Sequence, residues 1–513
     1  MKKLLSLTLA LVLCVGMLAG CSGSNNNDNA DGAEHDGIIK VAVSSDLTSL
    51  DPQNHNDTVS AYMTRHIYSN LVTINENNEF VGDLAESWNY VEGSDTKIAF
   101  KLKEGVKFHD GSTLTAEDVK FTLERCQTST KVPHLVAMID NVEVVDELNF
   151  IINLKYPSNT IISSLFHSGA AILSKSYTEG LEAEGKSLLD APMGTGQYKF
   201  VSWTPGTSCV IEKFDEYFDE TRAAQNKGIE MKVYLEDSAR TIALETGEID
   251  LCLKVPTTDA NRIKDNAELA LNEVAATHIE YFGFNTQKAP FDNKLVRQAM
   301  NYVVNKSDVV IAATEGVASP FDSYISSAAI GYYDTAVKYE YNLEKAKELL
   351  NEAGYNESNP LTFTAILSGD ARSKSATVIQ EALRQIGVTM NIESMEASTF
   401  YEKCGAGEQQ AYFAGWVANA EPDNTYRALW TDDGGNNYSH YSNPTVNDLV
   451  NVSATSLDKA EVENAFKTVL ATISDDAVWC PLYQMPSQLA YRAELQGVHN
   501  SPIGMHNLYA LHY

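Results

Sequence analysis

One stretch, residues 83–125, constrains the fold more than any other part of this 513-residue sequence. In its middle, apolar residues alternate with lysines, which predicts a strand with one buried face made by Ile98, Phe100 and Leu102. A second short strand is predicted after a Glu-Gly turn, with Val106 and Phe108 facing inward. A helix follows, and Thr115 with Asp118 three residues later predicts its capped start. The stretch is therefore expected to form a hairpin, a turn and a helix.

Strands and helices are predicted to alternate elsewhere. The pattern indicates a strand at 39–43 and a helix at 59–71. Further along, it indicates a strand, an amphipathic helix and a second strand at 361–367, 373–386 and 388–392. Such a βαβ unit favours a parallel sheet covered by helices.

The first residues have the organisation of a secretory signal peptide, predicted at 1–20. Two lysines precede an apolar run that is too short to span a membrane, which takes about 20 residues. The run ends in Leu-Ala-Gly-Cys, at Cys21. Residues 21–37 are rich in Asn, Gly and Asp and have little to bury, so we expect a disordered tether.

Composition narrows the possible functions. The net charge is -31, and loss of the two signal lysines makes it -33, which argues against nucleic acid as a partner. The remaining chain of about 475 residues is too long for one core. Five cysteines follow the signal and Cys21, an odd number without close spacing. We therefore expect buried thiols, with no disulfide framework, metal site or cofactor.

Two motifs invite a functional interpretation that their context does not favour. Residues 180–187 satisfy the P-loop pattern, but the preceding segment is polar, and Glu182 and Glu184 would repel a triphosphate. We therefore do not expect a phosphate-binding loop there. The histidines near the C-terminus lack interleaved carboxylates or cysteines, so we expect scattered surface residues at His499, His506 and His512.

The stretch at 83–125 resembles the signature region of the extracellular solute-binding proteins of family 5, the dipeptide and oligopeptide class that delivers ligands to ABC importers. The resemblance is carried by 84–88, 100–102, 105–111 and 115–119, and continues through 192–198, 281–285, 290–299, 415–424 and 441–449. The Leu-Ala-Gly-Cys ending also resembles the lipobox of bacterial lipoproteins, which implies that Cys21 carries a lipid.

The resemblance implies an α/β, two-lobe fold of the periplasmic-binding-protein type (large class II, or cluster C) with an extra subdomain in the first lobe. Lobe I is expected at 38–276 plus 484–513, with the subdomain at about 72–190. Lobe II is expected at 277–483. The chain would cross between lobes at 276–277 and 482–483, and closure around a ligand would link binding to a change of shape.

The resemblance also implies ligand-binding residues. In peptide-binding relatives an aspartate pairs with the ligand's ammonium three residues after the Gly-Trp tryptophan, but this sequence has Asn419 there. A neutral amide does not cancel the ligand's charge, although Glu421 or Asp423 could be displaced toward the cleft. Arg372 suits a ligand carboxylate or is a solvated charge. Further contacts are expected from Asn56, Thr58, Trp416 and Tyr426.

The sequence thus predicts a monomeric, lipid-anchored, extracytoplasmic substrate-binding protein of an ABC importer, which binds a peptide or peptide-like solute, works with permease and ATPase subunits, and is not an enzyme. The missing aspartate keeps other ligands open, namely a metal chelate, a modified amino compound or an oligosaccharide. A lipid-anchored hydrolase and a signalling receptor also remain as alternatives.

Overall fold

The structure is a computed structural model that describes residues 36–75, 79–418 and 422–513. The chain from Gly37 to Tyr513 forms one compact unit. The predicted signal at 1–20, Cys21 and nearly all of the predicted tether lie outside the described residues, as do Asn419 and Glu421. Within the described segments, no helix is both long and apolar enough to cross a membrane.

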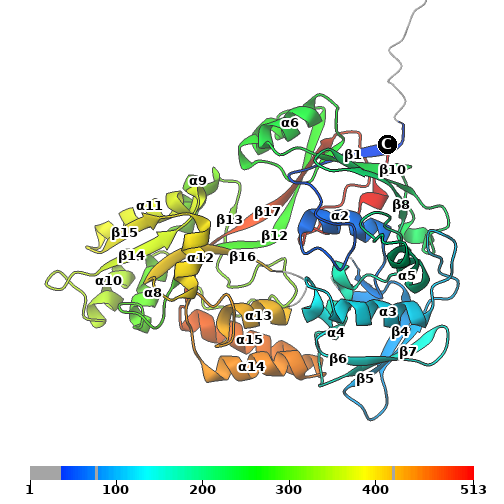
Figure 1. The fold of residues 1–513 in the computed structure, drawn as a ribbon. Coiled ribbons are helices and arrows are strands. Elements are labelled where there is room, and N and C mark those ends of the chain that lie inside the picture. The colour runs from blue at the N-terminus through cyan, green and yellow to red at the C-terminus, as the bar shows by residue number, and fades with distance from the viewer. Residues whose placement is uncertain (1–35, 76–78, 419–421) are drawn as a thin grey trace, which may run out of the picture. The chain divides into compact units, whose positions relative to one another are not determined.

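A mixed β-sheet runs through the molecule (Figure 1). Its strand order is β15-β14-β16-β12-β17-β11-β1-β10-β9-β8, and β13 pairs with β17 beside this path. The bounds are β1 (Ile38–Val43), β8 (Tyr198–Thr204), β9 (Ser208–Lys213), β10 (Gly228–Val233), β11 (Leu251–Cys252), β12 (Leu269–Phe284), β13 (Ser319–Pro320), β14 (Thr362–Leu367), β15 (Thr389–Ser394), β16 (Ala411–Val417) and β17 (Trp479–Arg492). This mixed α/β, two-lobe architecture confirms the predicted fold class.

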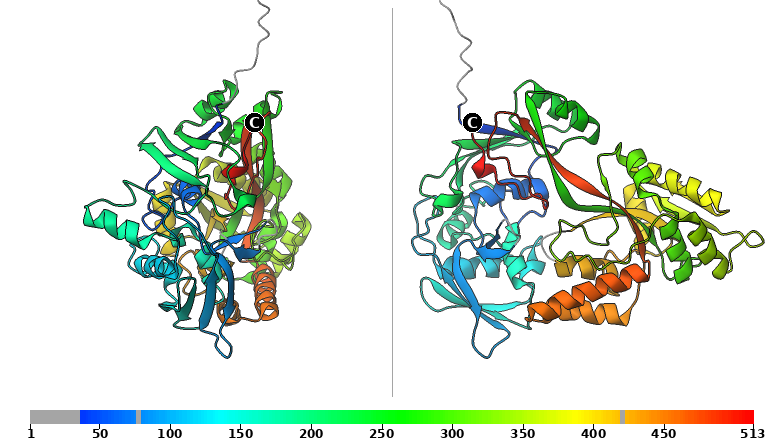
Figure 2. Two further views of the ribbon diagram at one scale, coloured as in Figure 1. Left: turned by 90° about the vertical axis from the view of Figure 1, so that its right-hand side faces the viewer. Right: turned by 180° about the vertical axis from the view of Figure 1, so that it is seen from behind.

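The long antiparallel strands β12 and β17 join the two ends of this sheet (Figure 2). Their pairing shifts register between Ala275 and Ile279, the irregularity typical of a β-bulge. Beside it, the side-chain amide of Gln484 donates to the carbonyl of Ala276 at 2.9 Å. Both predicted lobe crossings fall within these two continuous strands; the exact lobe boundaries stay a prediction.

Helices α2 (Thr58–Ile67) and α5 (Lys175–Ala183) share an apolar core with β1, β8, β9 and β10. Helices α6 (Asp237–Glu245) and α7 (Ala260–Lys264) share a separate core with β11, β12 and β17. One apolar core joins the sheet to α2 and to the C-terminal residues, because Ile39, Met63 and Leu511 belong to the same buried cluster. The C-terminal segment is thereby held beside α2.

Most elements of the predicted subdomain share one apolar core, and the bounds of this subdomain stay a prediction. Its elements are β2 (Val72–Ile74), β3 (Phe80–Gly82), β4 (Ala85–Tyr90), β5 (Lys97–Leu102), β6 (Ile139–Val144), β7 (Asn149–Leu154), α3 (Ala116–Gln127) and α4 (Ile161–Phe166). Strand β5 alternates exposed and buried residues as predicted, with Ile98, Phe100 and Leu102 buried. Thr115 is the N-cap of α3, and its backbone N–H donates to Asp118 at 2.9 Å, which confirms the predicted capped start.

Lobe II covers its part of the sheet with helices on both faces. They are α8 (Lys294–Val303), α9 (Lys306–Thr314), α10 (Leu343–Glu352), α11 (Asp370–Gln385), α12 (Ala397–Gly405), α13 (Pro422–Trp430), α14 (Pro444–Thr455) and α15 (Lys459–Asp475). Strands β14 and β15 are parallel and α11 lies between them in sequence, so the predicted βαβ unit is confirmed.

Three local expectations need correction. The second strand predicted at Val106 and Phe108 is absent from the described structure; both side chains are buried, but only an isolated bridge between Lys107 and Thr113 forms, and β5 pairs instead with β4 and β7. Helix α2 ends at Ile67 rather than at residue 71. His506 is buried rather than on the surface.

Two other expectations are confirmed. Gly180 lies inside α5, so residues 180–187 form a helix end and a turn rather than a strand-to-helix phosphate loop. The five described cysteines are all free and buried, and burial raises the pKa of four of them to about 12: Cys126, Cys209, Cys404 and Cys480.

Candidate binding site

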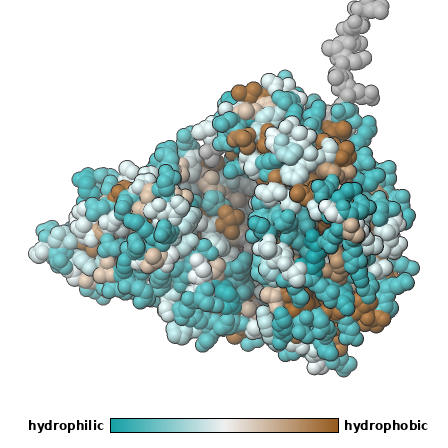
Figure 3. All heavy atoms as spheres, in the orientation of Figure 1, coloured by the Kyte–Doolittle hydropathy of each residue, from teal (hydrophilic) through white to brown (hydrophobic). Residues whose placement is uncertain are grey.

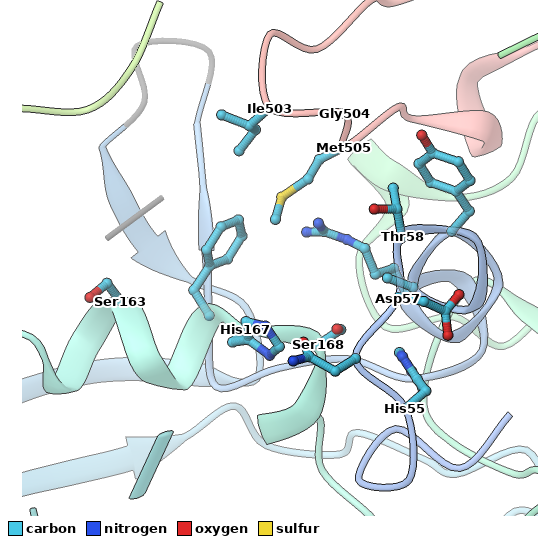
Figure 4. Close-up of a pocket in the computed structure, with 14 residues that line it drawn as sticks. His55, Asp57, Thr58, Ser163, His167, Ser168, Ile503, Gly504 and Met505 are labelled. Carbon is cyan, nitrogen blue, oxygen red and sulfur yellow. The ribbon is translucent and has the colours of Figure 1, made fainter. Parts of the chain in front are cut away.

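A pocket of about 220 Å³ opens in lobe I. Three separate segments line it: α2 with the chain entering it, the end of α4 with the residues after it, and the C-terminal segment at 503–505. In Figure 4 these segments are marked by His55, Asp57, Thr58, Ser163, His167, Ser168, Ile503, Gly504 and Met505. Because ligand sites typically have about 300–1,000 Å³, this pocket has the size of a subsite for part of a ligand.

Helix α2 is held firmly at both of its ends. Asp57 caps its start, accepting hydrogen bonds from the backbone N–H and the hydroxyl of Ser60, both at 2.8 Å. At its other end, a glycine turn packs against the last helical carbonyls. A Cβ on Gly194 would lie 2.4 Å from the carbonyl of Ile67, and one on Gly196 2.3 Å from that of His66. Glycine is therefore required at both positions of this turn.

Two of the predicted ligand-binding residues, Asn56 and Thr58, line this pocket, and both are exposed. The prediction had missed the pocket's other polar residues, among them Arg65. Arg65 lies in the last turn of α2, and its guanidinium carbon is 5.2 Å from the ring centre of Phe166. Burial lowers the pKa of Arg65 to about 10, against the opposing effect of Asp83, so the side chain is cationic at neutral pH.

Histidines surround Arg65. Burial, with Arg65 as a further cause, lowers the pKa of His66 to about 3 and those of His167 and His506 to about 4. Burial also lowers the pKa of His55. These rings are therefore neutral at pH 7, and Arg65 is the cation among them.

A second pocket, in lobe II, has a volume of about 450 Å³ and an aromatic lining that includes Tyr281, Tyr401, Trp416 and Tyr438. Trp416 was a predicted ligand contact. Its indole N–H donates to the hydroxyl of Thr425 at 3.3 Å, which fixes the ring's orientation. Figure 3 shows a hollow in the molecular surface between the two lobes, with hydrophobic residues exposed inside it.

Arg372, the predicted carboxylate ligand, lies in the first turn of α11 and forms a bidentate ion pair with Glu280 of β12. The Nε–Oε2 and Nη2–Oε1 distances are 2.8 and 3.0 Å. His278 lies 3.1 Å from the same carboxylate. Burial favours the neutral acid, but hydrogen bonds from His278 and Arg372 hold the pKa of Glu280 below its usual value. The charge of Arg372 is thus already balanced.

The other predicted site residues have structural partners. Asp423 pairs with Arg427 at 3.3 Å, one turn along α13. Tyr426 is fully buried, and its hydroxyl donates to the carbonyl of Gly331 at 2.9 Å. Asn419 and Glu421 lie outside the described residues. The predicted ligand contacts as a set therefore stay a prediction.

The sequence signal for the missed residues was weak. In the sequence, Arg65 has the pattern of a charge on the exposed face of an amphipathic helix. Met505, which lines the same pocket, is about 440 residues away from Arg65 in the chain. Only the fold brings α2, α4 and the C-terminal segment together, through the packing of the C-terminal residues beside α2.

A fold of two lobes joined by paired strands, with a pocket on each lobe, is typical of ligand-binding proteins. Comparison with known proteins identifies the class. Residues 79–438 match the family of bacterial extracellular solute-binding proteins, family 5, in its middle region. The chain belongs to this family.

Relatives with assigned names support the same family. The chain is 31% identical over 456 residues to a protein named glutathione-binding protein GsiB from Pectobacterium atrosepticum, covering 86% of this chain and 87% of that one. It is 27% identical to the GsiB of Escherichia coli K12, with 95% of each chain covered.

Solved structures share the fold. HbpA2 from Haemophilus parasuis superposes with a TM-score of 0.85 at 24% identity, covering 93% of this chain and 99% of that one. DppA from Helicobacter pylori, solved in complex with the peptide STSA, gives a TM-score of 0.72 at 27% identity, covering 93% and 98%.

Proposed function

We propose that this protein captures a peptide or peptide-like solute between its two lobes and delivers it to the permease of an ABC importer. The observation that carries the proposal is membership of the solute-binding family, together with a pocket on each lobe. Relatives named for glutathione and a fold relative solved with a tetrapeptide favour small peptides as the ligand class.

In this proposal the predicted contacts form two walls of one site. Asn56 and Thr58 on lobe I offer an amide and a hydroxyl, which suit the peptide groups of a ligand. Trp416 on lobe II offers an aromatic wall. The bulge in β12 beside Ala276 supports a hinge there, because an irregular pairing gives the strands a place to bend.

We also propose that the protein is tethered to the outer face of the cell membrane through a lipid on Cys21, after removal of residues 1–20. The support is the signal-like organisation of the N-terminus and its Leu-Ala-Gly-Cys ending. The strongly acidic chain would remain soluble beside the membrane.

Native mass spectrometry of the chain from Ser22 onward, as purified and after denaturation, tests the ligand class. A bound species in the peptide mass range that is released on unfolding would support the proposal. If the protein is isolated without a ligand, titration calorimetry with glutathione and short peptides tests whether it binds peptides. Binding of metal chelates or oligosaccharides in place of all of these peptides would contradict it.

A further inference from the structure

Arg65 is a cation without a hydrogen-bonded partner in the described part of the chain. It borders the lobe I pocket and also a smaller, polar pocket beside it. Its only specific described contact is the cation–π contact with Phe166 at 5.2 Å. A guanidinium carries five N–H donors, and leaving them unpaired in a partly buried position is unfavourable. These donors are available to an acceptor that enters the pocket.

The nearby carboxylates are occupied by other groups. Asp83 forms an ion pair with Arg222 at 2.5 Å and accepts from the backbone N–H of Asn70 at 3.1 Å. Asp57, which also lines the pocket, accepts from Ser60 and Thr48 as the N-cap of α2. Neither forms an ion pair with Arg65 in the described structure, and Asp83 favours the charge of Arg65 only through a longer-range attraction.

A second donor is available beside Arg65. The Nδ1 atom of His167 accepts a hydrogen bond from the backbone N–H of Gly169 at 3.0 Å. Since a neutral imidazole has one protonated nitrogen, the proton of His167 is on Nε2. Figure 4 shows His167 and Ser168 at the same wall of the pocket. The pocket therefore combines a guanidinium, an imidazole N–H and a hydroxyl.

This arrangement differs from lobe II. There Arg372 is held by Glu280 in a bidentate pair, and His278 contacts the same carboxylate. An anionic ligand group would compete with Glu280 for Arg372, whereas no described carboxylate forms an ion pair with Arg65. Of the two arginines, Arg65 is the one that is electrostatically prepared for an anion.

From these contacts we infer that Arg65 binds a carboxylate of the transported solute, so that a peptide ligand enters the lobe I pocket with an acidic end. The inference rests on the proposed function and deepens it, because it assigns the ligand class as peptides with a free carboxylate at that end. A planar guanidinium and a carboxylate make paired, charge-assisted hydrogen bonds.

Matched ligands test this assignment without altering the protein. Calorimetry would compare glutathione with its diethyl ester, and the tripeptide Ala-Ala-Ala with its carboxyl-terminal amide, on the chain from Ser22 onward. We expect a ligand that binds to lose affinity by roughly ten- to one-hundredfold when its carboxylates are blocked, the effect of one hydrogen-bonded charge. Equal affinity of the free and blocked forms would overturn the assignment while leaving the proposed function intact.

Variants then locate the effect. Arg65→Gln is expected to bind free and blocked forms alike, and Arg65→Lys to retain part of the preference. The matched control is Arg384→Gln, which removes an exposed arginine paired with Glu381 on α11.

A preference for free carboxylates that persists in Arg65→Gln would overturn the inference. If that variant does not fold, the partial loss in Arg65→Lys serves the same purpose. Absence of binding by every peptide to the unaltered protein would instead refute the proposed function, and with it this assignment.

Discussion

At the scale of single residues, Arg372 and Glu280 form the most tightly enclosed ion pair near the lobe II pocket. The two side chains are only 20% and 10% exposed. Such a pair adds little net stability, but removing one partner leaves the other charge buried and poorly compensated. If Arg372 has a structural role, its removal should therefore lower the stability of the protein, whereas a role in ligand binding alone would not require this.

We predict that Arg372→Ala lowers the free energy of unfolding by about 3 kcal/mol, because the carboxylate of Glu280 would stay buried after losing its bidentate arginine partner. The double variant Glu280→Gln/Arg372→Gln should lose clearly less, since it leaves no unpaired charge. Urea unfolding curves measure both. Equal losses in the single and double variants would contradict a coupled pair.

The neutral histidines of lobe I predict sensitivity to acid. The pKa values of His66, His167 and His506 are lowered to about 3, 4 and 4, whereas an unfolded chain protonates near pH 6.5. Above that value both states are neutral at these sites. As the pH falls below it, the unfolded state takes up protons that the folded state excludes, so stability falls.

Between pH 7 and pH 5 each such histidine should reduce the free energy of unfolding by on the order of 1–2 kcal/mol. Guanidinium unfolding at the two pH values measures the sum. His506→Asn should flatten the dependence, while His512→Asn, a change at another C-terminal histidine, serves as the control. A stability that is unchanged or higher at pH 5 would contradict the prediction.

Residue-level prediction from sequence located individual side chains better than their partners. Arg372 lies in the first turn of α11, close to the start that the sequence predicts for this helix. Its partner Glu280 is 92 positions away, and sequence patterns do not reveal such a pairing. Asn56 and Thr58 do line a pocket, whereas Arg65, which borders the same pocket, resembles an ordinary surface charge when read in sequence alone.

At the scale of elements, Asp118 shows how one side chain can organise two segments. One carboxylate oxygen accepts from the backbone N–H of Thr115 at 2.9 Å, at the start of α3, and the other accepts from the backbone N–H of Lys175 at 2.8 Å, at the start of α5. The sequence predicted only the first of these bonds, because the second depends on how the two helices pack.

We predict that Asp118→Ala costs about 2 kcal/mol of unfolding free energy, near the upper end of the range for a helix cap, because two backbone donors lose their acceptor. Thermal or urea unfolding measures this loss. Asp110→Ala, which removes an exposed turn residue close by, is the matched control and should cost less. Similar losses in both variants would argue against a special role of Asp118.

Elements were predicted well where local periodicity decides the structure, as in β5 and α11. They were predicted less well where distant contacts decide it. Helix α2 ends early because the next residues are bound by other segments: Asn70 by the side chain of Asp83, and Ser69 by the backbone of Ile172. The segment at Val106 and Phe108 is buried, yet β7 occupies the strand position that a hairpin would have required.

At the scale of the whole molecule, the proposed lipid anchor has a direct test. In the full-length chain, Cys21→Ser should abolish incorporation of a fatty-acid label and release the protein into the medium or periplasm, because the acyl chains would be the membrane attachment. Labelling with an alkyne fatty acid and cell fractionation measure both effects. Cys126→Ser is the matched control and should leave both unchanged. Retention of the label in Cys21→Ser would rule out this attachment site.

The buried thiols have a consequence for experiments that label the protein to follow its motion. All five described cysteines are enclosed and free, and their raised pKa values leave almost no reactive thiolate at neutral pH. A fluorophore or spin label that reacts with cysteine should therefore not label the folded chain from Ser22 onward. One new cysteine on the exposed surface of each lobe could then be labelled selectively, and the distance between the two labels would report the separation of the lobes. The natural buried cysteines would not have to be replaced first.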